Sequence, residues 1–201
     1  MFKAIFTNSF GILISRVFGF IRDLLTASTL GASIYTDIFF IAFKLPNLFR
    51  RIFAEGAFTQ VFIPAFARST HKAVFSVNIF FVFLSIILLI TLLVNLVPQL
   101  FTQAIAVGFS EETLKIAAPF VAINFWYLPL IFSMTFLSGM LQYKHHFATT
   151  AFSTALLNLS LIAALYLSQD KTDVQIVYYL SYGVVIGGVL QLIAHIVAIR
   201  Q

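Results

Sequence analysis

The sequence contains no cysteine and very little charge. The absence of cysteine from all 201 residues excludes a disulfide framework and any thiolate metal site. Charged residues make up only 9% of the chain, compared with roughly 25% in an ordinary soluble domain. Hydrophobic residues make up 61%, and the mean hydropathy is +1.01. This composition indicates an integral membrane protein.

Motifs for several kinds of chemistry are also absent. The chain has no GxxxxGK[ST] loop for nucleotide phosphates, no HExxH zinc motif and no GxSxG nucleophile turn. Adjacent His145 and His146 lack the i, i+3 or i+4 spacing of a helical metal pair. The net charge is +5, but the basic residues form no patch with interleaved aromatics of the kind that binds nucleic acid. We therefore expect no catalytic residues, no metal, no cofactor and no nucleic-acid partner.

Long apolar runs predict the fold class. A helix needs about 20 apolar residues to cross a bilayer. Four runs of that length contain no Lys, Arg, Asp or Glu, and two earlier runs are interrupted by charges. We predict an all-α polytopic membrane protein with six transmembrane helices in one lobe, at about 4–29, 34–53, 73–97, 116–143, 147–169 and 174–197. A cleaved signal peptide is an alternative for the first, but Arg16 and the Arg22-Asp23 pair interrupt its apolar region.

Basic residues in the predicted loops give an orientation. On the six-span reading, the basic clusters fall on one side of the membrane, and the 98–115 and 169–173 loops on the other side carry little net positive charge. The clusters are Lys3, then Arg68 with His71 and Lys72, then Lys144 with His145 and His146, and finally Arg200. By the positive-inside rule, both termini are expected in the cytoplasm.

Charged side chains within the first two predicted spans call for an explanation. With residues placed at 100° intervals on a helix, Arg16, Arg22 and Asp23 fall on the polar side of the first span. The second span runs into "KLPNLFRRIFAEGAF" and carries four ionisable groups within about 40° of one another, with Asn47 about 80° from the first of them. These groups are Asp37, Lys44, Arg51 and Glu55. The alignment requires a continuous helix, which Pro46 and Gly56 make doubtful.

Insertion costs exclude a lipid-facing position for these groups. Inserting a charged residue at mid-membrane costs roughly 2.5 to 3.5 kcal/mol of free energy. Inserting one apolar residue contributes far less in the favourable direction. A structural ion-pair network is one explanation, because three acids could neutralise three of the five basic groups of the two spans. The acids are Asp23, Asp37 and Glu55, and the basic groups are Arg16, Arg22, Lys44, Arg50 and Arg51. About two positive charges would remain without a partner. This number would be smaller if a basic side chain extended to the membrane interface. The favoured interpretation is a water-filled, electropositive cavity for an anionic ligand, since the planar arginine fork suits phosphate.

Several segments carry a resemblance to a known family. The stretch 15–66, "SRVFGFIRDLLTASTLGASIYTDIFFIAFKLPNLFRRIFAEGAFTQVFIPAF", closely resembles the opening of the MurJ (MviN) family of lipid II flippases. That family lies within the larger superfamily of multidrug, oligosaccharidyl-lipid and polysaccharide exporters. The segments "FLSGMLQ" at 136–142, "ALLNLSLI" at 155–162 and "GGVLQL" at 187–192 are similar to family segments at the expected spacing. The resemblance covers nearly the whole chain.

The resemblance implies a carrier in the bacterial cytoplasmic membrane. Its substrate would be the undecaprenyl-diphosphate-linked peptidoglycan precursor, moved from the inner to the outer leaflet by alternating access within membrane lipids. The cavity arginines Arg16, Arg22 and Arg51 would hold the diphosphate, and Asn47 would be a polar cavity group. The resemblance also assigns coupling or gating roles to three acids, which are Asp23, Asp37 and Glu55.

Length is the departure from the family pattern. The resemblance implies about fourteen spans and two lobes, whereas this chain predicts six spans, so the C-terminal lobe would be a missing partner. An N-terminal fragment and a truncated gene product both fit. Two other functions stay open: a flippase for polysaccharide repeat units on a lipid diphosphate, and a truncated membrane module that does not transport.

Overall fold

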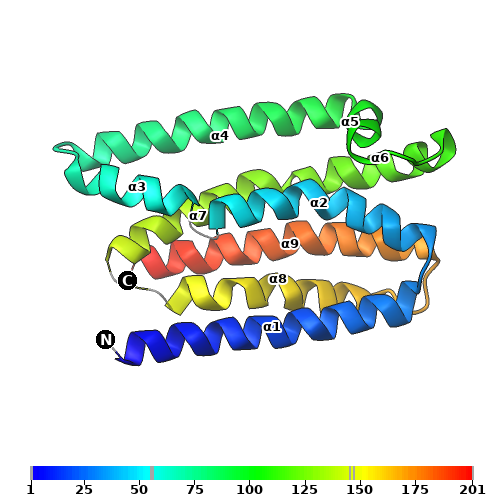
Figure 1. Cartoon of the computed structure of the whole chain (residues 1–201), viewed down its shortest axis with the longest axis horizontal. Coiled ribbons are helices and arrows are strands. Elements are labelled where there is room, and N and C mark those ends of the chain that lie inside the picture. Colours follow the sequence, from blue (N-terminus) through cyan, green and yellow to red (C-terminus); the bar gives the residue numbers. More distant parts are fainter. Residues whose placement is uncertain (1, 55–56, 145, 147, 201) are drawn as a thin grey trace.

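The protein is built from α-helices that run roughly side by side (Figure 1). The computed structural model describes residues 2–54, 57–144, 146 and 148–200, and this part of the chain contains no strand. Both chain ends lie at the same end of the bundle (Figure 1). The helices are α1 (Phe2–Leu30), α2 (Ile34–Ala54), α3 (Ala57–Arg68), α4 (Lys72–Leu96), α5 (Pro98–Ile105), α6 (Glu111–Phe125), α7 (Tyr127–Tyr143), α8 (Ala148–Leu167) and α9 (Asp173–Arg200).

The helix lengths and compositions confirm an all-α polytopic membrane protein. Four helical stretches among the described residues are long and apolar enough to cross a membrane: Lys72–Leu96, Glu111–Tyr143, Ala148–Leu167 and Asp173–Arg200. Helices α1 and α2 are also long, at 29 and 21 residues, but they contain the charges discussed above. The number of six crossings stays a prediction.

Prolines account for two differences between the predicted spans and the observed helices. The predicted 116–143 span is interrupted at Trp126, between α6 and α7. Pro129 lacks the N–H that would bond to the carbonyl of Phe125, so a continuous helix would lose a hydrogen bond at this place. Pro98 begins the short helix α5, which was not predicted, at a position where its missing N–H costs nothing. By contrast, Pro46 lies inside α2 without ending it, so the doubt about continuity there is removed.

Small residues allow α8 to pack closely between α1 and α9. A Cβ atom built on Gly11 of α1 would lie 2.8 Å from the Cβ of Ala151, and one built on Gly187 of α9 would lie 2.7 Å from the Cδ1 of Leu157. The helices can approach this closely only because Gly11 and Gly187 have no side chain. The Gly183 and Gly187 pair therefore serves helix packing within the bundle.

Buried polar bonds and apolar packing join the other helices. The Tyr127 hydroxyl donates to Gln191 Oε1 at 3.0 Å, and Gln191 Nε2 donates to the Ser153 carbonyl at 3.0 Å, which links α7, α8 and α9. Helix α2 buries Ile38 and Ala42 in the apolar core, in contact with the α6, α7 and α9 side of the bundle. Helix α1 packs mainly on α8 and hardly touches α2. This arrangement leaves space between α1 and α2.

Candidate functional site: a cationic cavity beside α2

A polar cavity occupies the space between α1 and α2. It has a volume of about 190 Å³. Helix α1 contributes Arg22, Asp23 and Thr26 to its lining, and α2 contributes Lys44, Asn47 and Arg51. Phenylalanines of α2 and Leu161 of α8 supply its apolar wall. Two helices that are consecutive in sequence but barely in contact thus share one polar space.

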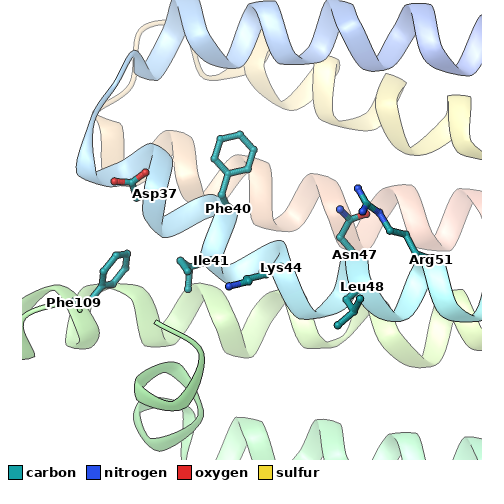
Figure 2. Close-up of a pocket in the computed structure, with 8 residues that line it drawn as sticks. All are labelled: Asp37, Phe40, Ile41, Lys44, Asn47, Leu48, Arg51 and Phe109. Carbon is teal, nitrogen blue, oxygen red and sulfur yellow. The ribbon is translucent and has the colours of Figure 1, made fainter. Parts of the chain in front are cut away.

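A larger cavity continues along α2. Its volume is about 590 Å³, and its lining includes Asp37, Lys44, Asn47 and Arg51 together with apolar side chains. Asn47 and Arg51 lie side by side, whereas Asp37 and Phe109 lie toward the other end (Figure 2). Lys44, Asn47 and Arg51 line both cavities, so the two spaces adjoin. The combined size is suitable for part of a small ligand or a headgroup.

The spacing of the α2 side chains follows from helix geometry. Residues three, four or seven positions apart share a helix face, and Lys44, Asn47 and Arg51 follow Asp37 at +7, +10 and +14. We call these four side chains the α2 stripe. They share a face only if the helical register is kept through Pro46, and α2 is continuous there. The sequence pattern and the observed helix therefore agree on the polar face of α2.

Two partners fix the guanidinium group of Arg22. Its Nη2 lies 2.6 Å from Asp23 Oδ1 and its Nε donates to the same oxygen at 3.0 Å. Its Nη1 donates to Asn158 Oδ1 of α8 at 2.9 Å. Asn158 in turn donates from Nδ2 to the Ser15 carbonyl of α1 at 3.0 Å. Arg22 is thus held in one orientation, since charge-assisted hydrogen bonds are short and directional.

The smaller cavity has an excess of positive charge. Its described lining contains three cations, Arg22, Lys44 and Arg51, and one acid, Asp23. Asp23 pairs with Arg22, and neither Lys44 nor Arg51 forms an ion pair with another described residue. Lys44 and Arg51 are exposed, so a ligand can reach both cations from outside. The arrangement can therefore attract and orient an anion.

The predicted site residues are only partly brought together. Arg22, Asp23, Asn47 and Arg51 line the smaller cavity, and Asp37 lies toward the far end of the larger one. Arg16 is exposed, has no hydrogen bond or ion pair with another described residue, and is not in the described lining of either cavity. Glu55 lies outside the described residues.

Comparisons with known proteins decide the family. The profile of the family described as "Lipid II flippase MurJ" matches residues 26–201. This chain belongs to the MurJ family. A "Probable lipid II flippase MurJ" of Helicobacter pylori (strain J99 / ATCC 700824) is 54% identical over 169 residues, which cover 84% of this chain and 37% of the relative. One from Rhizobium tropici is 38% identical over 200 residues, which cover 93% of this chain and 37% of the relative.

The structural comparison supports a MurJ fold for this chain. A solved structure titled "Lipid II flippase MurJ, inward closed conformation" matches with a TM-score of 0.81 at 24% identity. The match covers 93% of this chain and 41% of the other. The chain thus spans about 37% of the length of the MurJ relatives described above.

Sequence reasoning left two residues out of the predicted site of this MurJ-family chain. Lys44 lines both cavities, and its place on the α2 stripe was the signal that could have included it. Asn158 of α8 donates a hydrogen bond to the Ser15 carbonyl of α1. Its bond to Arg22 joins residues 136 positions apart, for which the sequence carries no local signal.

Proposed function

We propose that this chain is part of a carrier that moves lipid II, an undecaprenyl-diphosphate-linked precursor, from the inner to the outer leaflet of the bacterial cytoplasmic membrane. The excess positive charge of the cavity beside α2 carries this proposal. A diphosphate diester bears one negative charge on each phosphate, and arginine can donate two parallel hydrogen bonds to such a group. The relatives named "Probable lipid II flippase MurJ" support the choice of lipid.

The residues have distinct roles in this proposal. Arg22, held by Asp23 and Asn158, presents a fixed donor group, and Arg51 with Asn47 binds the diphosphate from α2. Arg16 lies outside the described lining of both cavities, and its role in holding the diphosphate is proposed from the family resemblance and its exposed place on the polar side of α1. The acids Asp23, Asp37 and Glu55 couple or gate the transition between the two accessible states.

Transport rather than catalysis is proposed for this chain. One lobe would rock against a second lobe around the binding site, and both termini of this chain would lie in the cytoplasm. The second lobe and the surrounding membrane lipids are the other proposed partners. An ion gradient or the membrane potential would supply the energy, and moving one charge across 100 mV provides about 2.3 kcal/mol.

The test uses a chimera in which this chain is followed by the remaining segment of the Helicobacter pylori relative. The readout is exposure of lipid-linked precursor to an enzyme added outside spheroplasts, with protein abundance recorded in parallel. We expect Arg51→Ala to reduce exposure at least roughly ten-fold at near-normal abundance, because a charge-assisted bond to phosphate is lost. Arg51→Lys should give intermediate precursor exposure, since lysine keeps the positive charge but cannot donate two parallel hydrogen bonds as the guanidinium group does.

The control is Arg68→Ala, at the exposed end of α3, which should transport normally. Normal precursor exposure in Arg51→Ala would refute the cavity assignment for this residue. The alternative of a structural ion-pair network predicts instead that Arg22→Ala, which removes the partner of Asp23, lowers protein abundance. Transport assays with purified lipids would distinguish lipid II from a lipid-linked polysaccharide repeat.

A further inference from the structure

A separate cavity with a mixed polar and apolar lining lies where α4, α5 and α6 meet, at the end of the bundle opposite the chain termini (Figure 1). Its volume is about 600 Å³, and it shares none of the described lining residues of the α2 cavities. Gln99 and Gln103 of α5 and Lys115 of α6 supply its polar groups, with Pro119 beside them. The proposed transport mechanism gives this cavity no role.

The cavity contains one cation and two amide side chains. Lys115 is the charged member of its described lining, is exposed, and forms no hydrogen bond or ion pair with another described residue. Gln99 and Gln103 are four positions apart, so they share one face of α5. Each amide can both donate and accept hydrogen bonds. A phosphate group placed here would meet an ammonium group and amide donors.

Acceptor groups lie next to this cation. Pro119 has no N–H, so the carbonyl of Lys115 lacks its usual donor within α6. Glu111 lies four positions before Lys115 on the same helix face, which is about 6 Å along the axis. Glu111 and Lys115 do not form an ion pair in the structure. Glu111 lies outside the described lining of the cavity, one helical turn from Lys115, so a headgroup with separated charges could extend from this cation to that acceptor.

The surroundings of the cavity are apolar and exposed. Leu96 at the end of α4 is 76% exposed and Leu100 on α5 is 64% exposed. In a polytopic membrane protein such side chains are covered by acyl chains, and a short amphipathic helix such as α5 suits the bilayer interface. The polar groups of the cavity are therefore within reach of lipid headgroups.

We propose that this cavity binds the headgroup of a membrane phospholipid of the phosphatidylethanolamine type. Its phosphate contacts the Lys115 ammonium and the amides of Gln99 and Gln103. Its primary ammonium donates to Glu111 and to the Lys115 carbonyl. A purely anionic headgroup fits less well, because the carboxylate of Glu111 lies one helical turn before Lys115 on the same helix face. The site is independent of the proposed transport substrate.

Lipid retention by the purified full chain tests this proposal. Native mass spectrometry after exchange into phosphatidylethanolamine, phosphatidylcholine or phosphatidylglycerol would count the lipids that remain bound. Wild type should retain phosphatidylethanolamine preferentially, since the quaternary ammonium of phosphatidylcholine has no N–H to donate. Lys115→Gln should lower that retention roughly ten-fold, as expected for loss of a charged hydrogen bond.

Lys171→Gln is the matched control, because Lys171 lies in the exposed turn between α8 and α9 and does not line the cavity. Its lipid retention should equal that of wild type. Glu111→Gln should retain phospholipid but lose the preference for phosphatidylethanolamine over phosphatidylcholine. Equal retention by Lys115→Gln and Lys171→Gln, or no headgroup preference in wild type, would overturn the proposal. Far-UV circular dichroism of each variant would verify that its helices are intact.

Discussion

Arg22 and Arg51 differ in what they contribute to the cavity beside α2. Arg22 has its positive charge compensated by Asp23 and its direction fixed by Asn158. Arg51 and Lys44 have no ion-pair partner among the described residues. In the proposed function, the attraction for an anion would therefore come mainly from α2, and Arg22 would supply oriented N–H groups. A pre-oriented donor loses less entropy when a ligand binds.

Asn158 fixes the orientation of Arg22 from another helix, α8, beside the two contacts that Arg22 makes with Asp23. In the chimera, Asn158→Ala should reduce precursor exposure roughly ten-fold, because Arg22 loses one of the bonds that hold its guanidinium. Leu159→Ala, on the 41% exposed neighbour in α8, is the control and should transport normally. Thermal stability should fall only modestly. Unchanged transport in Asn158→Ala would show that Arg22 needs no support from α8.

Helix α1 depends on a single neighbour for most of its packing. It is held against α8 by small residues, with Gly11 next to Ala151, and by hydrogen bonds from Ser15 and Asn158. The Ser15 hydroxyl donates to the Ala151 carbonyl at 3.3 Å. In lipid, the hydrophobic effect does not drive helices together. The close approach of α1 and α8 therefore stabilises their contact through van der Waals packing and hydrogen bonds. The position of Arg22 thus follows from the contact between α1 and α8.

Gly11→Val should separate these two helices. A Cβ at this position would lie 2.8 Å from the Ala151 Cβ and 3.1 Å from the Ala151 carbonyl carbon. We expect a loss of stability of roughly 1 to 3 kcal/mol, seen as a lower midpoint of thermal unfolding in detergent. Adding Ala151→Gly should recover only part of the loss, since the backbone contact remains.

Leu13→Val provides the control for this experiment. Leu13 is 58% exposed on α1, so the substitution should leave the unfolding midpoint nearly unchanged. If Gly11→Val unfolds at the same temperature as Leu13→Val, the close contact between α1 and α8 does not contribute to stability.

The whole molecule has two chemically different ends. Both termini and the turn between α3 and α4 lie at one end, and the turns after α1, α5 and α8 lie at the other (Figure 1). Basic residues gather at the first end, among them Arg68, Lys72, Lys144 and Arg200. Positively charged loops are retained in the cytoplasm during insertion. The orientation proposed for the chain rests on this asymmetry.

Cysteine labelling tests the orientation without background, because the natural chain has no cysteine. Single cysteines at Ser69 and Ala148 should be protected from an impermeant thiol reagent added outside intact cells. Cysteines at Ser33, Ser110 and Thr172 should react. Permeabilised cells serve as the control, in which all five positions become accessible. Labelling of the Ser69 variant from outside would reverse the proposed topology.

The sequence by itself determined the properties that depend on local periodicity and composition. Apolar runs of bilayer length specified a helical membrane protein, and the 3.6-residue repeat placed Lys44 and Arg51 on one face of α2. These features need no knowledge of neighbouring helices, because backbone geometry alone sets which side chains share a face. The quoted segments were also sufficient to indicate the family that the profile match then showed.

Only the tertiary structure decided which faces meet. The bond from Arg22 to Asn158 joins residues 136 positions apart, and it depends on the glycine-mediated contact between α1 and α8. The same packing leaves Arg16 outside the described lining of both cavities, although it shares the polar side of α1 with Arg22. Helix pairing arises from side-chain fit and polar bonds across distant segments. A periodic pattern in one segment cannot specify such pairings.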